Sequence, residues 1–493
     1  MAIAVATILA VLIAGCDDSA NDAGATAAFT HGVASGSVTR DSVVLWTRAV
    51  GGDRVIAEVA ADPSFATIAA TAEGRTSAQT DFTVRVKVDG LAPATRYAYR
   101  FRAGAAVSAT GVFLTAPAAD DAARVRFAFS GDSDGTRNAD GTPRFNNFEA
   151  LHAVAKAAPD FFLYIGDTIY GDRPPEAFSV EEYRAKYRQN REYPALTSLL
   201  AATSTYAIWD DHEVVNDFAA ETVDPARFEA GRQAFQEYVP LAEQPTPIMY
   251  RAFRWGAALD VIVLDTRSFR SASAAEACAN DPLPGGALPD APEPLRAIRT
   301  FAGLPAELPA GCPAALNDPA RTMLGAAQLA FLLERLRSSQ ATWKVVVTSV
   351  PMQSLLVLPY DRWEGYPAER RQILDAIRDE AIENVVFVTA DLHGNVLGPV
   401  RLDPFAALRP VAYEAIAGPI ATTPLRQDIV EVVGESAAGL LDDLLISVAG
   451  AECADLNAFA FGWVEVDPVA GTMTVSLRND SGAELCQTVL RAR

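Results

Sequence analysis

The sequence has few cysteines, few lysines and no apolar run long enough to cross a membrane, and these shortages limit the classes of protein to which it can belong. Its 493 residues carry 41 basic and 62 acidic side chains, a formal net charge of −21, and only four of the basic residues are Lys. Without clustered Lys and Arg, an acidic chain lacks the positive surface that nucleic acid binds, which excludes nucleic acid as a structural partner. Half of the residues are hydrophobic. This composition is that of a globular protein and excludes disordered, collagen-like and coiled-coil chains.

The first 15 residues form an uncharged apolar run, shorter than the roughly 20 residues that span a bilayer. The run ends at Ala14-Gly15-Cys16, and small residues before a Cys resemble the lipobox of bacterial lipoproteins. The sequence therefore predicts a lipoprotein signal peptide over residues 1–15 and a flexible tether over residues 16–28, with Cys16 acylated. The alternative is an ordinary signal peptide with a chance Cys.

We expect the protein to be exported, either to the periplasm or to another site outside the cytoplasm, and to be attached to the membrane through the lipid on Cys16. Asp17 follows this Cys directly and resembles the signal that retains lipoproteins at the inner membrane of organisms with two membranes. The first basic residue is Arg40, so the usual cationic start of a signal peptide is missing and the position of the true start codon stays open.

The remaining cysteines are even in number: Cys278, Cys312, Cys453 and Cys486. Four thiols allow three pairings, among which a sequence cannot choose. We favour Cys278–Cys312 and Cys453–Cys486, because closure of the shorter loops is the most favourable. A zinc site is the rival interpretation, but the chain has no C-x-x-C motif and no His beside these cysteines. Disulfides also agree with an oxidising compartment.

Two regions of different pattern follow the predicted tether. Residues 29–117 contain short strands with alternating apolar residues and no helical stripe, which predicts a small antiparallel sandwich of the immunoglobulin or fibronectin type. After a linker rich in Pro and Ala, residues 124–493 alternate short apolar strands with amphipathic helices, which predicts an α/β domain. A Cys- and Pro-rich insert interrupts this domain at about residues 271–320.

The predicted strands and helices of the second region alternate along most of its length. The strands are expected at residues 125–129, 161–165, 206–209, 259–264, 344–349, 385–389, 461–466 and 473–477. The helices are expected at residues 148–158, 180–189, 226–238, 326–337 and 367–380. Strands that are apolar throughout are buried on both faces, so helices or a second sheet must cover them.

Acidic or imidazole side chains follow five of these strands, at the point where each strand ends. Ligands of open α/β sheets bind at the carboxyl ends of the strands. One such acid could cap a helix, but five sets that include two of only four His residues are hard to explain as caps. Packed carboxylates repel each other unless cations neutralise them, so the pattern predicts two or more hard metal ions with mainly oxygen ligands. The segments are 130–134 (SGDSD), 166–172 (GDTIYGD), 210–213 (DDHE), 265–267 (DTR) and 390–395 (ADLHGN).

In this order the segments resemble the motifs of the calcineurin-like metallophosphoesterases, and most closely those of PhoD-type alkaline phosphatases and phosphodiesterases. Residues 31–36 (HGVASG) and 44–48 (VLWTR) are similar to the start of that family's N-terminal sandwich. The resemblance covers nearly the whole mature chain. It implies a layered fold of two packed sheets flanked by helices, preceded by the small all-β domain, with the phosphatase domain over residues 124–493.

The resemblance also implies a set of metal ligands. Asp167 matches the carboxylate that bridges the metal ions, and Tyr170 matches the phenolate ligand of an iron(III) site. Asp211 lies where most metallophosphoesterases have a ligand Asn. Asp391 and His393 match the final pair of ligands.

One ligand position departs from the family pattern. Asp132 occupies the place where PhoD-type enzymes often have a Cys, which exchanges a soft ligand for a hard one and weakens the inference of iron. Asp134 could supply a further ligand for calcium or another divalent ion. The expected cofactors are therefore two or more metal ions, with Fe(III) and Ca(II) suspected and other divalent ions possible.

Other residues match positions around the reacting phosphate. His212 matches the His that faces the leaving group, and we expect Asp210 or Glu213 to orient it. Asn216 resembles a family Asn near the phosphate. Asp265 and Arg267 are expected to hold sheet and loop together.

The function that this resemblance implies is hydrolysis of phosphate esters by a metal-activated hydroxide that attacks in line, with His212 protonating the leaving group. A serine nucleophile is disfavoured, because neither Ser130 nor Ser133 lies in a G-x-S-x-G turn. One alternative is a phosphodiesterase or phospholipase D-like enzyme acting on teichoic acid, phospholipid or nucleotide diesters. A second is a non-catalytic phosphate-binding lipoprotein. We expect a monomer whose partner is a phosphate-ester substrate.

Overall fold

The computed structural model describes residues 27–242, 249–288, 291–405, 409–435, 439, 445–446 and 449–493. The predicted signal peptide and the Cys16 lipidation site lie outside the described residues. Within the ranges given, none of the helices combines the length and the apolar character that a membrane span requires.

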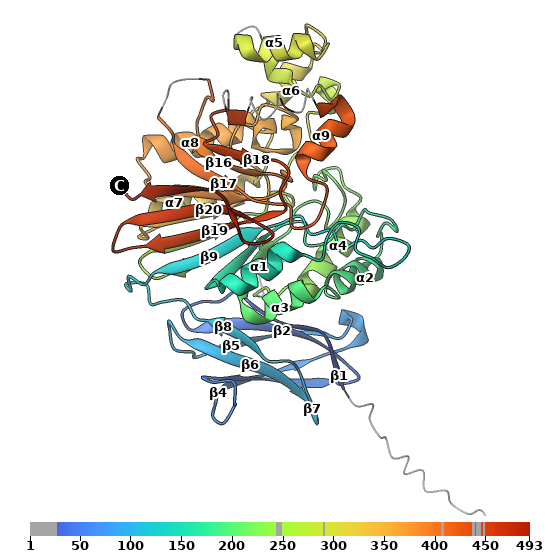
Figure 1. Ribbon diagram of the computed structural model, residues 1–493, viewed down its shortest axis with the longest axis vertical. Coiled ribbons are helices and arrows are strands. Elements are labelled where there is room, and N and C mark those ends of the chain that lie inside the picture. The colour runs from blue at the N-terminus through green and yellow to red at the C-terminus, as the bar shows by residue number, and fades with distance from the viewer. Residues whose placement is uncertain are drawn as a thin grey trace, which may run out of the picture.

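Strands near the amino terminus form two facing layers, which are blue at the bottom of Figure 1. One layer contains β1 (Ala28–Gly36), β2 (Ser42–Val50) and β5 (Thr83–Asp89). Alternation decides which side chains point inward: in β5 the Val side chains are buried, whereas Arg85, Lys87 and Asp89 are exposed. The other layer contains β3 (Arg54–Ala60), β4 (Ile68–Arg75), β6 (Arg96–Ala103), β7 (Ala106–Val107) and β8 (Gly111–Leu114).

The first of these layers continues into the rest of the molecule. β1 pairs in parallel with β11 (Ser204–Ile208) through Gly36 and Thr205. Only Gly fits at this contact, because a Cβ at position 36 would lie 2.6 Å from the Thr205 carbonyl oxygen. The N-terminal sandwich therefore shares a sheet with the region that follows it, a continuity that the sequence pattern does not reveal.

This shared sheet is one of two that pack face to face. Its strand order is β21-β20-β19-β9-β10-β11-β1-β2-β5. Its central strands β9, β10 and β11 are parallel to one another. The strands introduced here are β9 (Val125–Ser130), β10 (Phe161–Ile165), β19 (Ala460–Asp467), β20 (Thr472–Asn479) and β21 (Glu484–Arg491).

The second sheet has the order β12-β13-β14-β15-β17-β16-β18. Its side chains Val345 and Val386 share one apolar core with Phe127 and Phe161 of the first sheet, so this core lies between the sheets. The strands are β12 (Arg251–Trp255), β13 (Leu259–Val263), β14 (Trp343–Val347), β15 (Val385–Thr389), β16 (Asn395–Val400), β17 (Ala412–Ile416) and β18 (Cys453–Asp455).

Helices cover the outer faces of the two sheets (Figure 1). The first sheet carries α1 (Glu149–Ala157), α2 (Val180–Asn190), α3 (Pro194–Ala202) and α4 (Pro225–Tyr238). The second sheet carries α7 (Gly325–Ser338) and α8 (Pro367–Asp379), whose Leu332 and Ile373 pack on Val346 in a second core. The predicted fold, two packed sheets flanked by helices after a small all-β domain, is confirmed.

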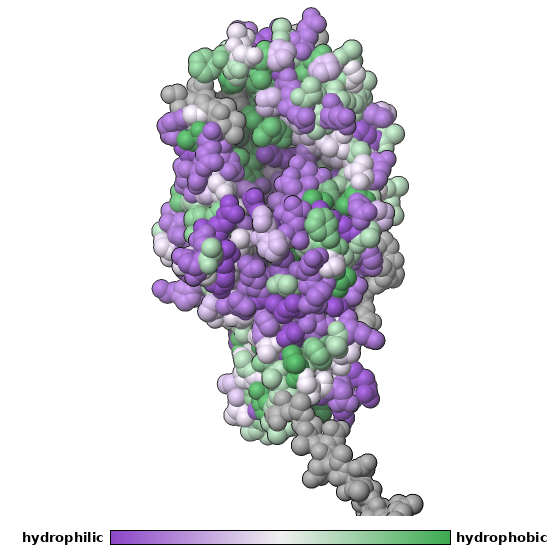
Figure 2. Space-filling view, turned by 90° about the vertical axis from the view of Figure 1, so that its right-hand side faces the viewer, coloured by the Kyte–Doolittle hydropathy of each residue, from purple (hydrophilic) through white to green (hydrophobic). Residues whose placement is uncertain are grey.

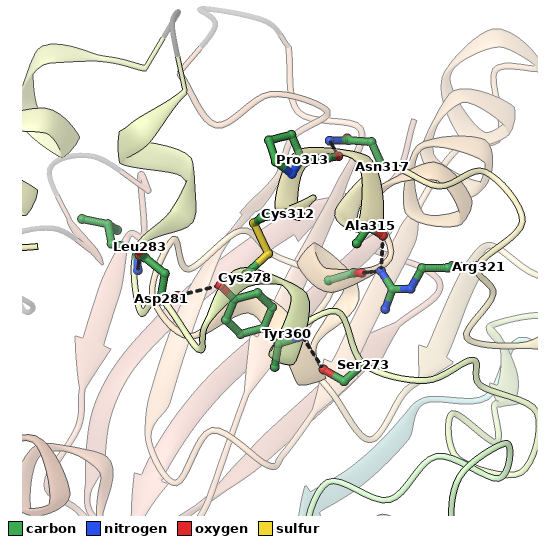
Figure 3. The surroundings of a disulfide bond; sticks show 12 residues. Ser273, Cys278, Asp281, Leu283, Cys312, Pro313, Ala315, Asn317, Arg321 and Tyr360 are labelled. Carbon is green, nitrogen blue, oxygen red and sulfur yellow. Dashed lines mark hydrogen bonds between the residues drawn. A yellow bond between two sulfur atoms is a disulfide. The ribbon is translucent and has the colours of Figure 1, made fainter. Parts of the chain in front are cut away.

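The Cys-rich insert contains the short helices η2 (Glu276–Cys278), η3 (Pro284–Ala287), α5 (Glu293–Phe301) and α6 (Cys312–Leu316). A disulfide joins Cys278 at the end of η2 to Cys312 at the start of α6, as Figure 3 shows. The Tyr360 hydroxyl beside this disulfide donates to the Asp281 carbonyl oxygen at 2.8 Å. Arg321 donates to the Gly365 carbonyl oxygen at 2.5 Å and so ties the end of the insert to the body.

The second disulfide joins Cys453 of β18 to Cys486 of β21. These strands are the edges of the two sheets, so this bond closes one side of the sandwich. Both favoured pairings are therefore present. The helix α9 (Leu425–Val433) precedes β18 in the chain. Figure 2 shows the right-hand face of Figure 1 as a mostly hydrophilic surface with a hollow in its upper part.

Candidate metal centre

Carboxylate and imidazole side chains from distant loops meet in three overlapping groups, in each of which the ligand atoms lie within 4.8 Å of one another. Asp167 belongs to two of the groups and Asp211 to two, so the three groups form one continuous cluster. The groups are Asp132–Asp167–His393, Asp167–Asp211–His212 and Asp211–Asp217–Asp361. Five of these residues follow β9, β10, β11 or β15, as the sequence pattern predicts.

Hydrogen bonds between the loops hold the cluster together. The Asp391 backbone N–H donates to Asp132 Oδ1 at 3.1 Å, and the His212 backbone N–H donates to Asp167 Oδ1 at 3.2 Å. The backbones of Asp132, Asp167, Asp391 and His393 have φ angles of 62°, 49°, 63° and 52°. Residues other than Gly rarely adopt this left-handed conformation, which costs about 1 kcal/mol each. The interlocked loops therefore impose a strained backbone at the points where the cluster forms, a feature that is common at functional sites.

Three carboxylate oxygens in or beside the cluster are buried without a hydrogen-bond partner among the described residues: Asp132 Oδ2, Asp134 Oδ2 and Asp211 Oδ1. Burial raises the pKa of Asp132 and Asp167 well above the ordinary value, and the negative charges of Asp210 and Asp211 raise both further. An unpaired buried oxygen costs free energy that a bound cation recovers. Carboxylates with imidazoles are the donors that hard and borderline metal ions take. The residues present therefore fit a multinuclear metal site.

Tyr170 lies against this cluster. Its hydroxyl oxygen is 3.2 Å from His393 Nε2, and its ring stacks on the His212 ring with 4.1 Å between the centroids. Burial and the nearby charge of Asp167 raise the pKa of the Tyr170 hydroxyl well above its ordinary value. A cation in contact with the hydroxyl would reverse that shift.

His212 is oriented by a residue to which the sequence assigned no role. Its Nδ1 is 2.7 Å from Asp172 Oδ1, while Asp172 Oδ2 accepts the Asn216 backbone N–H at 3.0 Å. Burial opposes protonation of His212, but the charge of Asp211 and the hydrogen bond with Asp172 outweigh it and raise the pKa to about 9. The prediction that Asp210 or Glu213 orients His212 is therefore wrong.

Asp210 is instead half of a buried ion pair. Arg267, which is fully buried, donates to Asp210 Oδ1 and Oδ2 at 2.6 and 3.0 Å. The same guanidinium donates to both carboxylate oxygens of Asp361 at 2.7 Å. Glu213 accepts the backbone N–H groups of Asp167 and of its neighbour Thr168. These contacts fix the positions of the loops relative to one another. Asp210 and Glu213 therefore support the cluster structurally.

Besides Tyr170, two predicted ligands lie outside the three groups. Asp134 accepts the Thr136 backbone N–H at 2.8 Å, and its other oxygen lies 3.6 Å from Arg173 Nε. Asp391 joins the cluster through its backbone contact with Asp132. For Asn216, the contact beside His212 is made by its backbone N–H.

Residues 138–475 match the model of the PhoD-like phosphatases, and residues 15–117 match the model of the N-terminal domain of these phosphatases. The chain belongs to the PhoD-like phosphatase family. Alkaline phosphatase D of Bacillus subtilis is 29% identical over 422 residues, which span 76% of this chain and 66%, just under two thirds, of that protein.

Two solved structures share the fold of this PhoD-like chain. One, a structure of PhoD, has a TM-score of 0.74 at 24% identity, and the match covers 94% of this chain and 89% of the chain in that structure. The other is a purple acid phosphatase from seeds of yellow lupin (Lupinus luteus), with a TM-score of 0.60 at 11% identity, covering 94% of this chain and 74% of its own.

The PhoD-like fold also brings in two acids that sequence reasoning missed. Asp217 directly follows Asn216 and could have been found as a further acid of that segment. Asp361 lies in the 3₁₀ turn Pro359–Asp361, far from any predicted strand end, and no signal in the sequence marks it. It enters the cluster only because Arg267 and Arg270 bind its carboxylate.

Proposed function

We propose that this protein is an enzyme that hydrolyses phosphate esters at a multinuclear metal centre. The observation that carries the proposal is the continuous cluster around Asp167 and Asp211, which combines carboxylate oxygens that have no hydrogen-bond partner among the described residues with an oriented His212. The proposed ligands are Asp132, Asp134, Asp167, Tyr170, Asp211, Asp391 and His393. Of these, Asp134 and Asp391 have the least support, because both lie outside the three groups and, unlike Tyr170, have no side-chain contact with a member of them among the contacts described above.

Bound metal ions would supply an activated water, by lowering its pKa toward about 7, and would neutralise the phosphoryl oxygens. Tyr170 beside His393 supports iron(III) as one ion, since phenolate oxygen is a strong ligand for that ion. The carboxylate of Asp132 supports a hard ion such as calcium as another. We therefore propose Fe(III) and Ca(II) as the cofactors.

His212 is proposed as the residue that protonates the leaving alkoxide. A ring nitrogen of His212 lies within 4.8 Å of ligand atoms of Asp167 and Asp211, which places it beside any phosphate bound there. Asp172 occupies Nδ1 and stabilises the protonated ring, so Nε2 stays available as the donor. The raised pKa of His212, about 9, keeps this proton in place at neutral pH.

Replacing the shared ligand tests this proposal. We expect Asp167→Asn to lose both bound metal and hydrolysis of p-nitrophenyl phosphate, because Asp167 contributes to two of the three groups. The matched control is Asp140→Asn, at an exposed Asp in a surface turn, which should retain both. Hydrolysis at the parental rate by Asp167→Asn would contradict the assignment. If the metal-loaded parent protein binds phosphate but hydrolyses neither a monoester nor a diester, this result would favour the non-catalytic alternative.

We also propose that the protein is an exported lipoprotein, anchored through Cys16 and retained at the inner membrane. The two disulfides support export, since such bonds persist in oxidising compartments. Mass spectrometry of protein from membranes tests the anchor: the expected product begins at an acylated Cys16, and an unmodified product found only in the soluble fraction would contradict it.

A further inference from the structure

Arg173 is a partly exposed cation at the edge of the metal centre. Its guanidinium carbon lies 5.6 Å from the centroid of the Tyr170 ring, and its Nε lies 3.6 Å from Asp134 Oδ2. This separation is too long for a hydrogen bond, and Nε has no hydrogen-bond partner among the described residues. The Arg173 side chain is 36% exposed, whereas that of Asp134 is 1% exposed. The Arg173 side chain is therefore partly accessible from solvent.

Tyr170 connects Arg173 to both imidazoles of the cluster. The Tyr170 hydroxyl oxygen is 3.2 Å from His393 Nε2, and the Tyr170 ring stacks on the His212 ring. Because the guanidinium of Arg173 lies over the same Tyr170 ring, its positive charge is on the side of the cluster where these two imidazoles lie.

Two other arginines near the cluster are not available to bind an anion from solvent. Arg267 and Arg270 have side chains that are 0% and 1% exposed, and both bind the carboxylate of Asp361. Their charges are thus neutralised and shielded from solvent. Arg173 differs in being exposed and incompletely paired.

The loop that carries Arg173 is held firmly against the centre. The Gly171 backbone N–H donates to the His212 carbonyl oxygen at 2.8 Å, and Lys186 donates to the Arg173 carbonyl oxygen at 2.7 Å. Only Gly fits at position 171, because a Cβ there would lie 2.4 Å from the Tyr183 ring. The backbone at Arg173 is therefore held in place, so that a ligand does not have to order the loop when the side chain binds it.

We propose that Arg173 binds a non-bridging oxygen of the substrate phosphate and makes the enzyme prefer monoesters to diesters. This inference rests on the proposed phosphoesterase function and names its substrate class. A monoester carries two negative charges near neutral pH and a diester one, so a cation beside the phosphate favours the monoester. The planar guanidinium can donate two parallel hydrogen bonds to phosphate, which Lys cannot do.

Substitution of Arg173 in the metal-loaded protein tests the proposal. We expect Arg173→Gln to lower kcat/KM for p-nitrophenyl phosphate by about 10- to 100-fold, the effect of one lost charge-assisted hydrogen bond, and kcat/KM for bis(p-nitrophenyl) phosphate by less than about threefold. Arg173→Lys should recover part of the monoester activity. Arg124→Gln is the matched control, since Arg124 has a 78% exposed side chain before β9 that pairs with Asp467.

Binding of inorganic phosphate, measured by calorimetry together with metal content, gives a readout that does not depend on turnover. We expect Arg173→Gln to retain its metal and to bind phosphate about tenfold more weakly than the parent. Equal losses for monoester and diester, unchanged phosphate affinity, or loss of metal would each overturn the inference. The experiment distinguishes failure of the proposed function from failure of this inference. If the parent protein hydrolyses no ester, the phosphate-binding measurement still shows whether Arg173 contributes to binding.

Discussion

The contact between His212 and Asp172 provides a sharp test of how the centre works. Asp172 accepts from the ring at Nδ1 through one oxygen and from the Asn216 backbone N–H through the other. In Asp172→Asn, the single amide oxygen can satisfy only one of these donors. If the oxygen stays with the backbone N–H, the amide NH₂ faces Nδ1 and forces the ring into the tautomer that accepts at Nδ1. The ring then no longer has a carboxylate to stabilise its protonated form.

The expected cost follows from this single contact. A partner that orients a catalytic or ligating His is typically worth about 10- to 100-fold in activity. We therefore expect kcat for a monoester to fall by that factor in Asp172→Asn, which corresponds to about 1.4 to 2.7 kcal/mol. Because His212 is proposed to protonate the leaving group, the loss should be larger for an alkyl phosphate than for p-nitrophenyl phosphate, whose leaving group needs little help.

The assay compares kcat for the two substrates in the parent, in Asp172→Asn and in Glu176→Gln. Glu176 lies on the same loop, and its side chain is 50% exposed, so its substitution should change neither rate. Metal content measured on each sample separates the loss of orientation from loss of the centre. An Asp172→Asn variant with full metal and an unchanged kcat on the alkyl phosphate would refute the role assigned to this pair.

Three further predictions concern stability, each measured by urea unfolding. Asp81→Asn should cost about 2 kcal/mol at neutral pH, because this carboxylate accepts from two arginines and a tyrosine. Burial alone would raise the pKa of Asp81, but these contacts lower it, so the parent's advantage should be full above pH about 4 and disappear as pH falls through the lowered pKa. Arg267→Met should cost about 3 to 5 kcal/mol, since it leaves Asp210 buried without its cation. Replacing Cys278 and Cys312 by Ser should cost up to about 3 kcal/mol, chiefly through the insert.

The outcomes that would contradict these predictions differ. For Asp81, a cost that persists at low pH would show that packing, rather than the charge, makes the contribution. For Arg267, a variant as stable as the parent would mean that Asp210 is protonated or solvated when unpaired. For the disulfide, hydrogen exchange should rise in the insert and not in the central strands, and a rise throughout both sheets would contradict local stabilisation.

Local pattern predicted the central sheets well. The expected strands at residues 161–165 and 385–389 match β10 and β15 residue by residue, because these strands are apolar throughout and end abruptly at polar loops. The expected helices at residues 180–189 and 367–380 agree with α2 and α8 to within one residue. In α2 a capping box between Ser179 and Glu182 marks the start.

Elements whose stability depends on their neighbours could not be predicted in this way. β21 is an edge strand with mostly half-buried or exposed side chains, so it lacks the strong alternation that marks a strand. The pairing of β1 with β11 rests on the close approach of Gly36 to Thr205, which only the three-dimensional fold creates.

The residues of the candidate site also fall into those that local sequence patterns predict and those that depend on the tertiary fold. Asp132, Asp167 and Asp211 follow parallel strands of one sheet, whose carboxyl ends lie at the same edge, so strand prediction brings these three together. His393 follows β15 of the other sheet and joins them only because the two sheets pack face to face. Asp361 comes from an irregular segment and depends on the tertiary fold. The partner of His212 could not be chosen from the sequence, since several acids lie near it along the chain and only geometry distinguishes them.

The most direct test of the central claim is the number and position of metal ions in the active protein, measured by elemental analysis and by anomalous diffraction from crystals. We predict two or more ions per chain, with Asp167 between neighbouring ions and Asp211 in contact with at least one. Fully active protein that contains no metal, or ions bound only elsewhere on the chain, would contradict this prediction.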